Sequence, residues 1–341
     1  IGATSQVSDT ASANTPADYG KTAEEGFSTV MIWIMSLFAW LVGVAAITLD
    51  NAVYYTVVTM GNYVNNLSAV GVTWRILRDL GNIIIIFGFL AIGITTILNV
   101  NWYGGKMKML PMLLVSAVFL NFSLFITEAV IDTGNLFATQ FYTQINGGVS
   151  PTREALSGVT VGTFGSGSIG NEAISNAIMG QLGLQTIYGK VRTDPKIFEG
   201  ANSWLIGFMG TILFIIAAFV MFSLAFILIA RFVILLFLII ISPVAFAGLA
   251  IPQLASMAKK WWSTLFEQTI TAPVLLLLLY VALAVITDVQ FLTGSCGKGT
   301  CTKDWTGFVS GNDLSGFGGM VLSFLVAMGL LLAVTIFSKK L

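Results

Sequence analysis

The feature that most constrains this chain is a series of charge-free apolar segments, each about as long as a bilayer is thick. A membrane-spanning helix needs about 20 predominantly apolar residues. Residues 30–49 and 82–100 meet this requirement, and the densest apolar runs lie at 204–230 and 232–241. Only 9% of the residues are charged, against about 25% in a typical soluble domain. The sequence therefore predicts an all-α, polytopic integral membrane protein, a helical bundle whose main solvent is lipid.

Weaker segments decide how many helices cross the membrane. We expect six to eight transmembrane helices, with further spans at about 111–131, 264–286 and 319–337. Residues 52–70 carry three asparagines and predict either a second span or a helix lying at the interface. Ser242-Pro243 interrupts the apolar run at 232–255, which favours a re-entrant hairpin broken at Pro243.

These segments divide the chain into four regions. Residues 1–28 are polar and acidic, which is typical of a disordered extracytoplasmic N-terminus. This segment is either a mature end left by signal-peptide removal or an artificial boundary. The other regions are the N-terminal transmembrane helices at 29–131, a Gly-rich extracytoplasmic loop at 132–201, and the C-terminal transmembrane helices at 202–341, which include a Cys-containing outer loop at 291–317.

The positions of lysine and arginine predict the orientation, because these residues concentrate in short cytoplasmic loops. A cytoplasmic location fits Lys106, Lys108, Arg231, Lys259, Lys260, Lys339 and Lys340. The N-terminus, the Gly-rich loop and the Cys loop are then outside, and the C-terminus is cytoplasmic. This arrangement requires 51–70 to span and 232–255 not to cross fully. If 232–255 spans, the Gly-rich loop and the N-terminal half turn inside.

Composition excludes several catalytic classes. Histidine is absent, which removes Ser-His-Asp and Cys-His catalysis and the HExxH zinc site. There is no GxxxxGK[ST] phosphate loop, and the formal net charge of zero provides no bulk basic field for nucleic acid. We therefore expect a non-enzymatic protein without a cofactor or a metal.

Four residues are candidates for pore or partner contacts: Arg231, Glu128, Asn121 and Pro243. An arginine between two apolar runs costs about 2.5–3.5 kcal/mol at mid-bilayer, so Arg231 should be paired, face water or lie at an interface. It either contacts a pore or partner or snorkels to the cytoplasmic surface. Glu128 belongs either to an ion relay or to the outer headgroup region, and the polar side chain of Asn121 should face other helices.

Two further sets of residues concern the membrane surface and the outer loop. Lys259, Lys260, Trp261 and Trp262 form a basic–aromatic sequence that predicts an interface anchor. Cys296 and Cys301 lie in GSCGKGTC, where glycines can bend the chain, and disulfides persist outside the cytoplasm. A disulfide between them is favoured over two unpaired thiols.

Two stretches carry a family resemblance, WRILRDLGNIIIIFGFLAIGITTIL at 74–98 and LLVSAVFLNFSLFITEAVIDTGNLFATQFY at 113–142. Together they resemble the TrbL-like polytopic inner-membrane proteins of type IV secretion (conjugation) systems. The second half is similar in the order of Arg231, Ser242-Pro243, Pro252 and Trp261-Trp262. The likeness covers residues 30–290.

This resemblance implies a channel or scaffold subunit of a machine that transfers DNA or protein across the bacterial cytoplasmic membrane. The implied partners are the lipid bilayer, cytoplasmic ATPases and other secretion-system subunits, translocated DNA or protein, and further copies of the chain. The alternative is a stand-alone transporter or channel for a small solute, with Asn121, Ser123, Thr127 and Glu128 lining a path with Arg231.

Overall fold

The computed structural model describes residues 16–98, 106–146, 148, 174–181, 203–249, 251, 254–286 and 325–336, and the regular elements among them are helices. A bilayer offers no partners for backbone N–H and C=O groups, so apolar sequence forms helices, which satisfy these groups internally. The predicted all-α class is confirmed for this part of the chain.

The elements in chain order are α1 (Pro16–Val53), the π-helix η1 (Tyr54–Val58), α2 (Met60–Asn66), α3 (Ser68–Ile97), α4 (Lys106–Asn121), α5 (Ser123–Ile145), α7 (Ile174–Gln181), α9 (Ser203–Ala247) and α10 (Ala255–Ile286). A shorter apolar helix, Leu325–Ile336, follows near the C-terminus.

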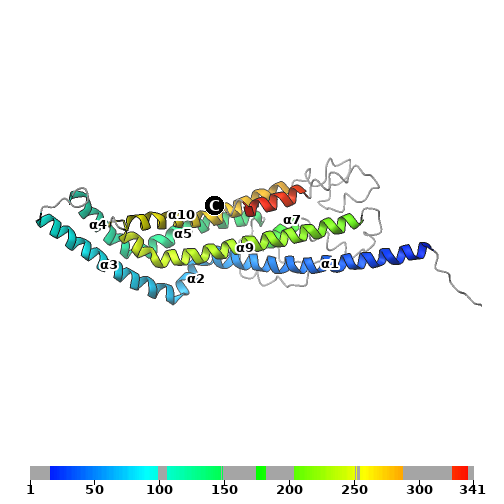
Figure 1. Ribbon diagram of the computed structural model, residues 1–341, viewed down its shortest axis with the longest axis horizontal. Coiled ribbons are helices and arrows are strands. Elements are labelled where there is room, and N and C mark those ends of the chain that lie inside the picture. Colours follow the sequence, from blue (N-terminus) through cyan, green and yellow to red (C-terminus); the bar gives the residue numbers. More distant parts are fainter. Residues whose placement is uncertain are drawn as a thin grey trace, which may run out of the picture.

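Figure 1 shows an elongated bundle whose long helices lie roughly along one axis. α1 and α9 run side by side, α10 packs on α5 and α9, and α3 continues beyond the bend at α2 toward the far end. The C-terminal ends of α3 and α9 therefore lie toward the same end as the N-terminal ends of α4 and α10. The C-terminal ends of α5 and α10 point toward the other end, where α9 begins.

Four described helices are long and apolar enough to cross a membrane: Trp33–Val58, Ser68–Ile97, Gly207–Ala247 and Ala255–Ile286. The pair Leu110–Asn121 and Ser123–Ile145 passes the same test together but bends by 70° at Phe122. The chain thus has the helices of a multi-pass membrane protein, and in the part described four of them, or five with the bent pair, could span a membrane. The expected number of six to eight is not confirmed.

The segment at 232–255 differs from the predicted hairpin, because α9 continues through Arg231 and Pro243 to Ala247. Pro243 has no N–H group for the carbonyl of Ile239 four residues earlier. The hydroxyl of Ser242 donates to that carbonyl at 2.7 Å and replaces the missing donor. The interruption read from Ser242-Pro243 is therefore repaired locally, and the helix does not break there.

Residues 52–70 do not form a span of their own. They comprise the end of α1, the π-helix η1, the seven residues of α2 and the first turn of α3. A helix of seven residues is about 10 Å long, far short of the ~30 Å hydrocarbon core. This segment is a bend between α1 and α3.

Two hydrophobic cores follow one another along α9 and α10. The first core joins α1 and α7 with the first half of α9 and the second half of α10, and it includes Phe214 and Leu279. The second core joins α2, α3, α4 and α5 with the other halves of α9 and α10, and it includes Leu120 and Leu265. Arg231 lies in α9 between them.

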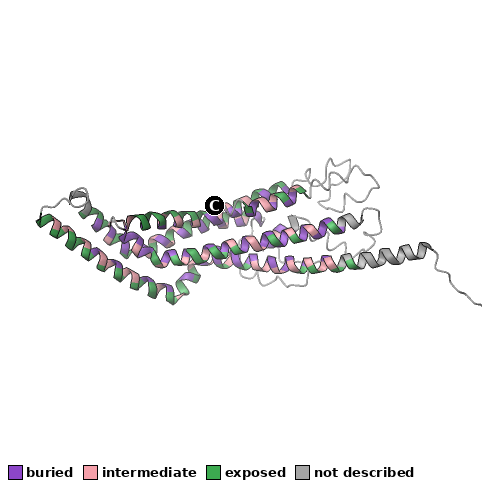
Figure 2. Ribbon diagram, in the orientation of Figure 1, coloured by how far each residue is buried: buried purple, intermediate pink, exposed green. Residues whose placement is uncertain are grey.

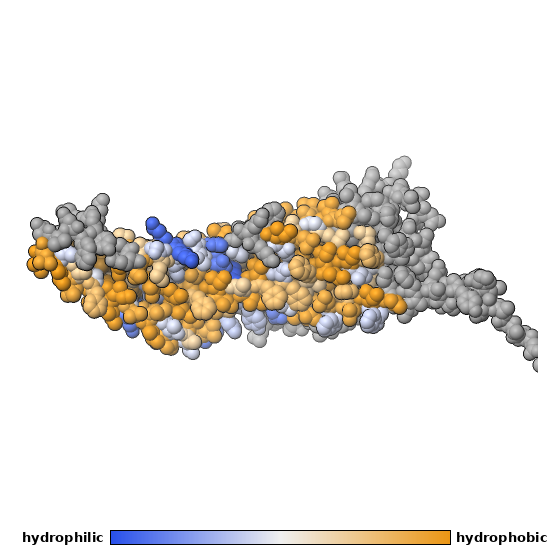
Figure 3. All heavy atoms as spheres, viewed as in Figure 1, coloured by the Kyte–Doolittle hydropathy of each residue, from blue (hydrophilic) through white to orange (hydrophobic). Residues whose placement is uncertain are grey.

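Large apolar side chains remain exposed outside both cores. Figure 2 shows exposed residues along α3 and on the outer side of the bundle, and hydrophobic residues cover most of the coloured part of the face in Figure 3. On α9 alone, exposed apolar side chains extend from Phe208 to Ile241. The molecule has an apolar surface along nearly its whole described length.

Part of the predicted loop at 132–201 is helical. α5 carries the chain on to Ile145, and α7 packs into the first core through its buried residues Ile174, Ile178 and Met179. The Gly-rich tract at 162–170 lies outside the described residues.

Candidate functional site

Arg231 lies near the middle of α9 with its side chain inside the bundle, where it is only 1% exposed. α9 is continuous through Arg231, and its apolar residues before and after Arg231 pack into the first and the second core. This packing holds Arg231 inside the bundle, between the two cores. This geometry differs from an arginine that snorkels to the cytoplasmic surface. The guanidinium reaches other helices instead.

Three segments far apart in sequence accept hydrogen bonds from the guanidinium. Nε donates to the backbone carbonyl of Gln268 in α10 at 2.7 Å. One terminal nitrogen donates to Oδ1 of Asn135 in α5 at 2.8 Å, and the other lies 3.5 Å from the carbonyl oxygen of Thr56 in η1. We call this group the arginine centre: the Arg231 and Asn135 side chains with the carbonyls of Thr56 and Gln268.

The π-helix η1 explains why the Thr56 carbonyl is available. The Thr59 N–H donates to the Tyr54 carbonyl at 2.9 Å, five residues back, and η1 ends there. The last carbonyls of a helix have no donor within it. The Thr56 carbonyl can therefore accept from a different helix, and single π-helical turns of this kind are frequent at functional sites.

α10 lacks one backbone hydrogen bond beside Gln268. Pro273 lies inside α10 and lacks the N–H that would bond to the Thr269 carbonyl. α5 passes close to α10 at this turn. A Cβ atom added to Gly134 would lie only 2.8 Å from the Thr269 carbonyl oxygen. A glycine at position 134 brings the next residue, Asn135, within reach of Arg231.

Neutral acceptors surround the positive charge of Arg231. The one ion pair among the described residues is the exposed Arg78–Asp79 pair, with 2.8 Å between Nη2 and Oδ1. The partners of Arg231 are an amide and two backbone carbonyls, which neither attack a substrate nor transfer protons near neutral pH. What the arginine centre can do is join η1, α5, α9 and α10 at one point and hold a fixed positive charge inside the bundle.

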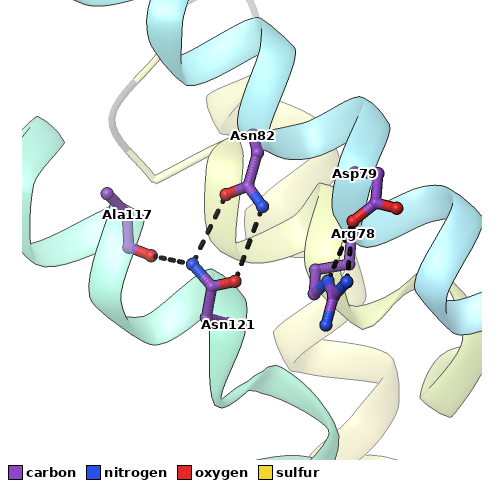
Figure 4. A network of polar contacts seen from close by, with 5 residues as sticks. All are labelled: Arg78, Asp79, Asn82, Ala117 and Asn121. Atoms are coloured by element: carbon purple, nitrogen blue, oxygen red, sulfur yellow. Dashed lines mark hydrogen bonds and ion pairs between the residues drawn. The ribbon is translucent and has the colours of Figure 1, made fainter.

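Asn121 lies on a different contact, between α4 and α3 (Figure 4). Its side-chain amide faces that of Asn82 at 3.4 and 3.5 Å and also donates to the Ala117 carbonyl at 2.9 Å. The hydroxyl of Ser123 accepts a hydrogen bond from the Trp74 indole at 3.1 Å. These polar residues face other helices, as their type predicts, but they do not reach the arginine centre.

Glu128 is half-buried on α5 and lines a cavity that Arg75 of α3 also lines. Asp132 and Asn135 follow at intervals of four and three residues, so the three side chains share one face of α5. Glu128 thus lies on the same helical face as the arginine centre, two turns away.

Trp261 of α10 forms a hydrogen bond with α9 close to Pro243. The Trp261 indole N–H donates at 3.1 Å to the carbonyl of Leu238, one residue before the carbonyl that Pro243 leaves free. Trp261 is buried, and its ring packs against Phe246 and Trp262 with centroids 5.8 and 5.0 Å away. Of the four predicted anchor residues, Lys259 and Lys260 are exposed, Trp262 is half-buried, and Trp261 is part of the core.

Reasoning from the sequence missed a second buried polar contact, between α1 and α7. Asp50 is 3% exposed and accepts hydrogen bonds from the Ser175 backbone N–H at 3.1 Å and from the Ser175 hydroxyl. A carboxylate at a helix N-terminus satisfies a free N–H group and opposes the helix dipole favourably. Asp50 directly follows the span predicted at 30–49; in the structure α1 continues to Val53, and Asp50 faces α7.

Cys296 and Cys301 lie outside the described residues, so their disulfide stays a prediction. No group of three His, Cys, Asp or Glu side chains able to hold a metal ion occurs in the described part of the chain. No protein-family model matches this chain, and no curated protein and no solved structure matches it either. What the chain does is therefore argued from its own residues.

Proposed function

We propose that the chain is a non-enzymatic channel or scaffold subunit of a type IV secretion-like machine in the bacterial cytoplasmic membrane, where DNA or protein is transferred. The resemblance of residues 74–98 and 113–142 to TrbL-like proteins supports this proposal. The order of Pro243 and Trp261 supports it as well, because the Trp261 indole bonds to the Leu238 carbonyl, next to the carbonyl for which Pro243 has no N–H. This hydrogen bond gives the proline–tryptophan order a structural role, which related proteins would be expected to share.

The observation that carries the proposal is the length of the apolar surface. Exposed apolar side chains on α9 extend from Phe208 to Ile241, which is about 50 Å at 1.5 Å per residue. A hydrocarbon core is about 30 Å thick, and a tilt of 40° would still leave a projection of about 38 Å. A bilayer alone does not cover this surface, so we infer that protein subunits cover the remainder.

The proposed orientation follows the lysines and the direction of the helices. The exposed Lys259 and Lys260 begin α10, and Lys106 and Lys108 begin α4. Because these two ends point the same way, one cytoplasmic side can hold all four lysines. The N-terminus and the loops after α5 and α10 are then outside, and the C-terminus is proposed to be cytoplasmic. This orientation no longer needs 51–70 to span, because α1 and α3 run in the same direction on either side of the bend (Figure 1).

The proposed partners follow from this orientation. Cytoplasmic ATPases would meet the lysine-bearing end, extracytoplasmic subunits would meet the loops, and further copies of the chain or other membrane subunits would cover the exposed apolar faces. The translocated DNA or protein would pass alongside the bundle.

A stand-alone transporter or channel for a small solute is the alternative. The row Glu128, Asp132 and Asn135 on one face of α5 favours it, because such a row could relay an ion toward the arginine centre. Solute flux by the reconstituted protein that disappears in Glu128→Gln would support this alternative.

The experiment that tests the proposal is purification of the tagged protein from its native membrane in mild detergent, followed by mass spectrometry. Secretion ATPases and outer subunits are expected to co-purify, and an in-frame deletion is expected to abolish DNA or protein transfer. A clean, self-associated protein with no such partners, together with intact transfer in the deletion strain, would refute the proposal.

A further inference from the structure

A cavity of about 290 Å³ lies where α2 turns into α3, against α5. Its polar lining comes from Asn65, Ser68, Arg75 and Glu128, and Leu67 and Leu124 contribute apolar walls. Ligand pockets range from about 300 to 1,000 Å³, so this volume suits a small group, such as a lipid headgroup.

Two opposite charges line this one cavity. Arg75 and Glu128 do not form an ion pair with each other, since the one pair among the described residues is Arg78–Asp79. A ligand that carries both an anion and a cation can lie between them and bond to each. The first turn of α3, which no side chain caps, also lines the cavity through Ser68, Val70 and Gly71.

An apolar stripe leads away from the cavity along α3. Its members are exposed and recur at intervals of three or four residues: Val72, Ile76, Leu80, Ile83, Phe87, Leu90 and Ile94. Val72 also lines the cavity itself. The stripe spans about 33 Å at 1.5 Å per residue, enough for an extended acyl chain to lie along it. A polar cavity continuous with such a stripe fits an amphiphile better than a soluble solute.

We propose that this cavity binds the headgroup of a phospholipid with a phosphate and a primary ammonium, the chemistry of phosphatidylethanolamine. Arg75 bonds the phosphate, Glu128 and the Asn65 amide oxygen accept from the ammonium, and the acyl chains lie on the α3 stripe. A quaternary ammonium has no N–H to donate and prefers aromatic cages, whereas the residues that line this cavity are not aromatic. An anionic headgroup without an amine would leave Glu128 unpaired beside negative charge.

The test is intact-protein mass spectrometry of the full chain, equilibrated in detergent with phosphatidylethanolamine, phosphatidylcholine or phosphatidylglycerol of identical acyl chains. The first lipid is expected to be retained about tenfold more tightly, the factor that corresponds to roughly 1.4 kcal/mol. Glu128→Gln is expected to reduce its advantage over phosphatidylcholine to about twofold or less, because the ammonium loses a charged acceptor. Arg75→Gln is expected to weaken retention of all three lipids, because each carries the phosphate.

The matched control is Glu267→Gln, which removes an exposed charge on α10 and should leave retention unchanged. Thermal unfolding of each variant checks that the fold persists. Equal retention of the three lipids, preferential retention of phosphatidylglycerol, or an undiminished preference in folded Glu128→Gln would overturn the proposal. Free phosphoethanolamine that binds as tightly as the lipid would overturn the lipid assignment.

Discussion

Arg231 carries the most unusual chemistry of any single residue here, a buried cation held by neutral acceptors. The sequence singles it out, because an arginine between two apolar runs has to find polar partners. Its partners could not be predicted, since two of them are backbone carbonyls, that of Thr56 in the π-helix η1 and that of Gln268 in α10. No side-chain pattern indicates which carbonyls of a helix are free.

The arginine centre gives a first prediction. Replacing Asn135 with leucine removes an acceptor and leaves a buried charge less well satisfied, so the variant should lose about 2–4 kcal/mol of unfolding free energy. Asn135→Asp should lose less or gain stability, because a carboxylate pairs directly with the guanidinium. Unfolding by detergent titration measures both, and equal losses in the two variants would contradict this account of the centre.

Ser242 and Pro243 give a second prediction. Ser242→Ala should cost about 1 kcal/mol, because the Ile239 carbonyl loses the donor that replaces the missing N–H of Pro243. In the Pro243→Ala background the backbone N–H returns, so the serine should matter much less. The interaction free energy from this double-mutant cycle is the measurement. Additive effects would mean that the hydroxyl does not substitute for the proline N–H.

At the scale of elements, apolar periodicity predicts the helices well and their breaks poorly. α3, α9 and α10 appear where long apolar runs predict helices. The break was expected at Pro243, yet α9 is continuous there, and the chain bends instead at Phe122, where no proline or glycine marks it. A helix end depends on whether neighbouring groups supply the missing hydrogen bonds, and those neighbours are distant in sequence.

The short helix α7 illustrates the same limit. Its eight residues lie in the region 132–201, predicted as an extracytoplasmic loop because it has too little apolar length to cross a membrane. The segment is nevertheless part of the first core, because Asp50 binds its N-terminal turn and Ile178 packs inside. Its partners in α1, α5 and α10 are distant in sequence, and the Asp50 contact comes from more than 120 residues earlier.

The crossing of α5 and α10 gives a third prediction. A methyl group on Gly134 would collide with Thr269, so Gly134→Ala should force the two helices apart and cost about 1–3 kcal/mol. Gly93→Ala is the matched control, since nothing lies within 4 Å of a Cβ atom there. In a helix, alanine is favoured over glycine, so this control should be neutral or slightly stabilising. Equal effects of the two substitutions on detergent-induced unfolding would argue against close packing at Gly134.

At the scale of the whole molecule, two cores in series make a bundle longer than a bilayer is thick. α9 has 45 residues and is about 68 Å long, more than twice a ~30 Å hydrocarbon core. Apolar composition predicts the membrane class but not this length, because two adjacent spans and one long helix have the same sequence pattern. The continuity of α9 past Arg231 is the observation on which the proposal of protein partners rests.

The central claim is that protein covers the part of this surface that lipid cannot reach, and photocrosslinking in native membranes tests it most directly. A photoreactive phenylalanine analogue replaces Phe208 or Phe237, exposed residues about 44 Å apart on α9, or the fully buried Phe214 as the control. We expect a crosslink to another protein chain from at least one of the exposed positions and none from position 214. Lipid adducts alone at both exposed positions would contradict the claim and favour a stand-alone membrane protein.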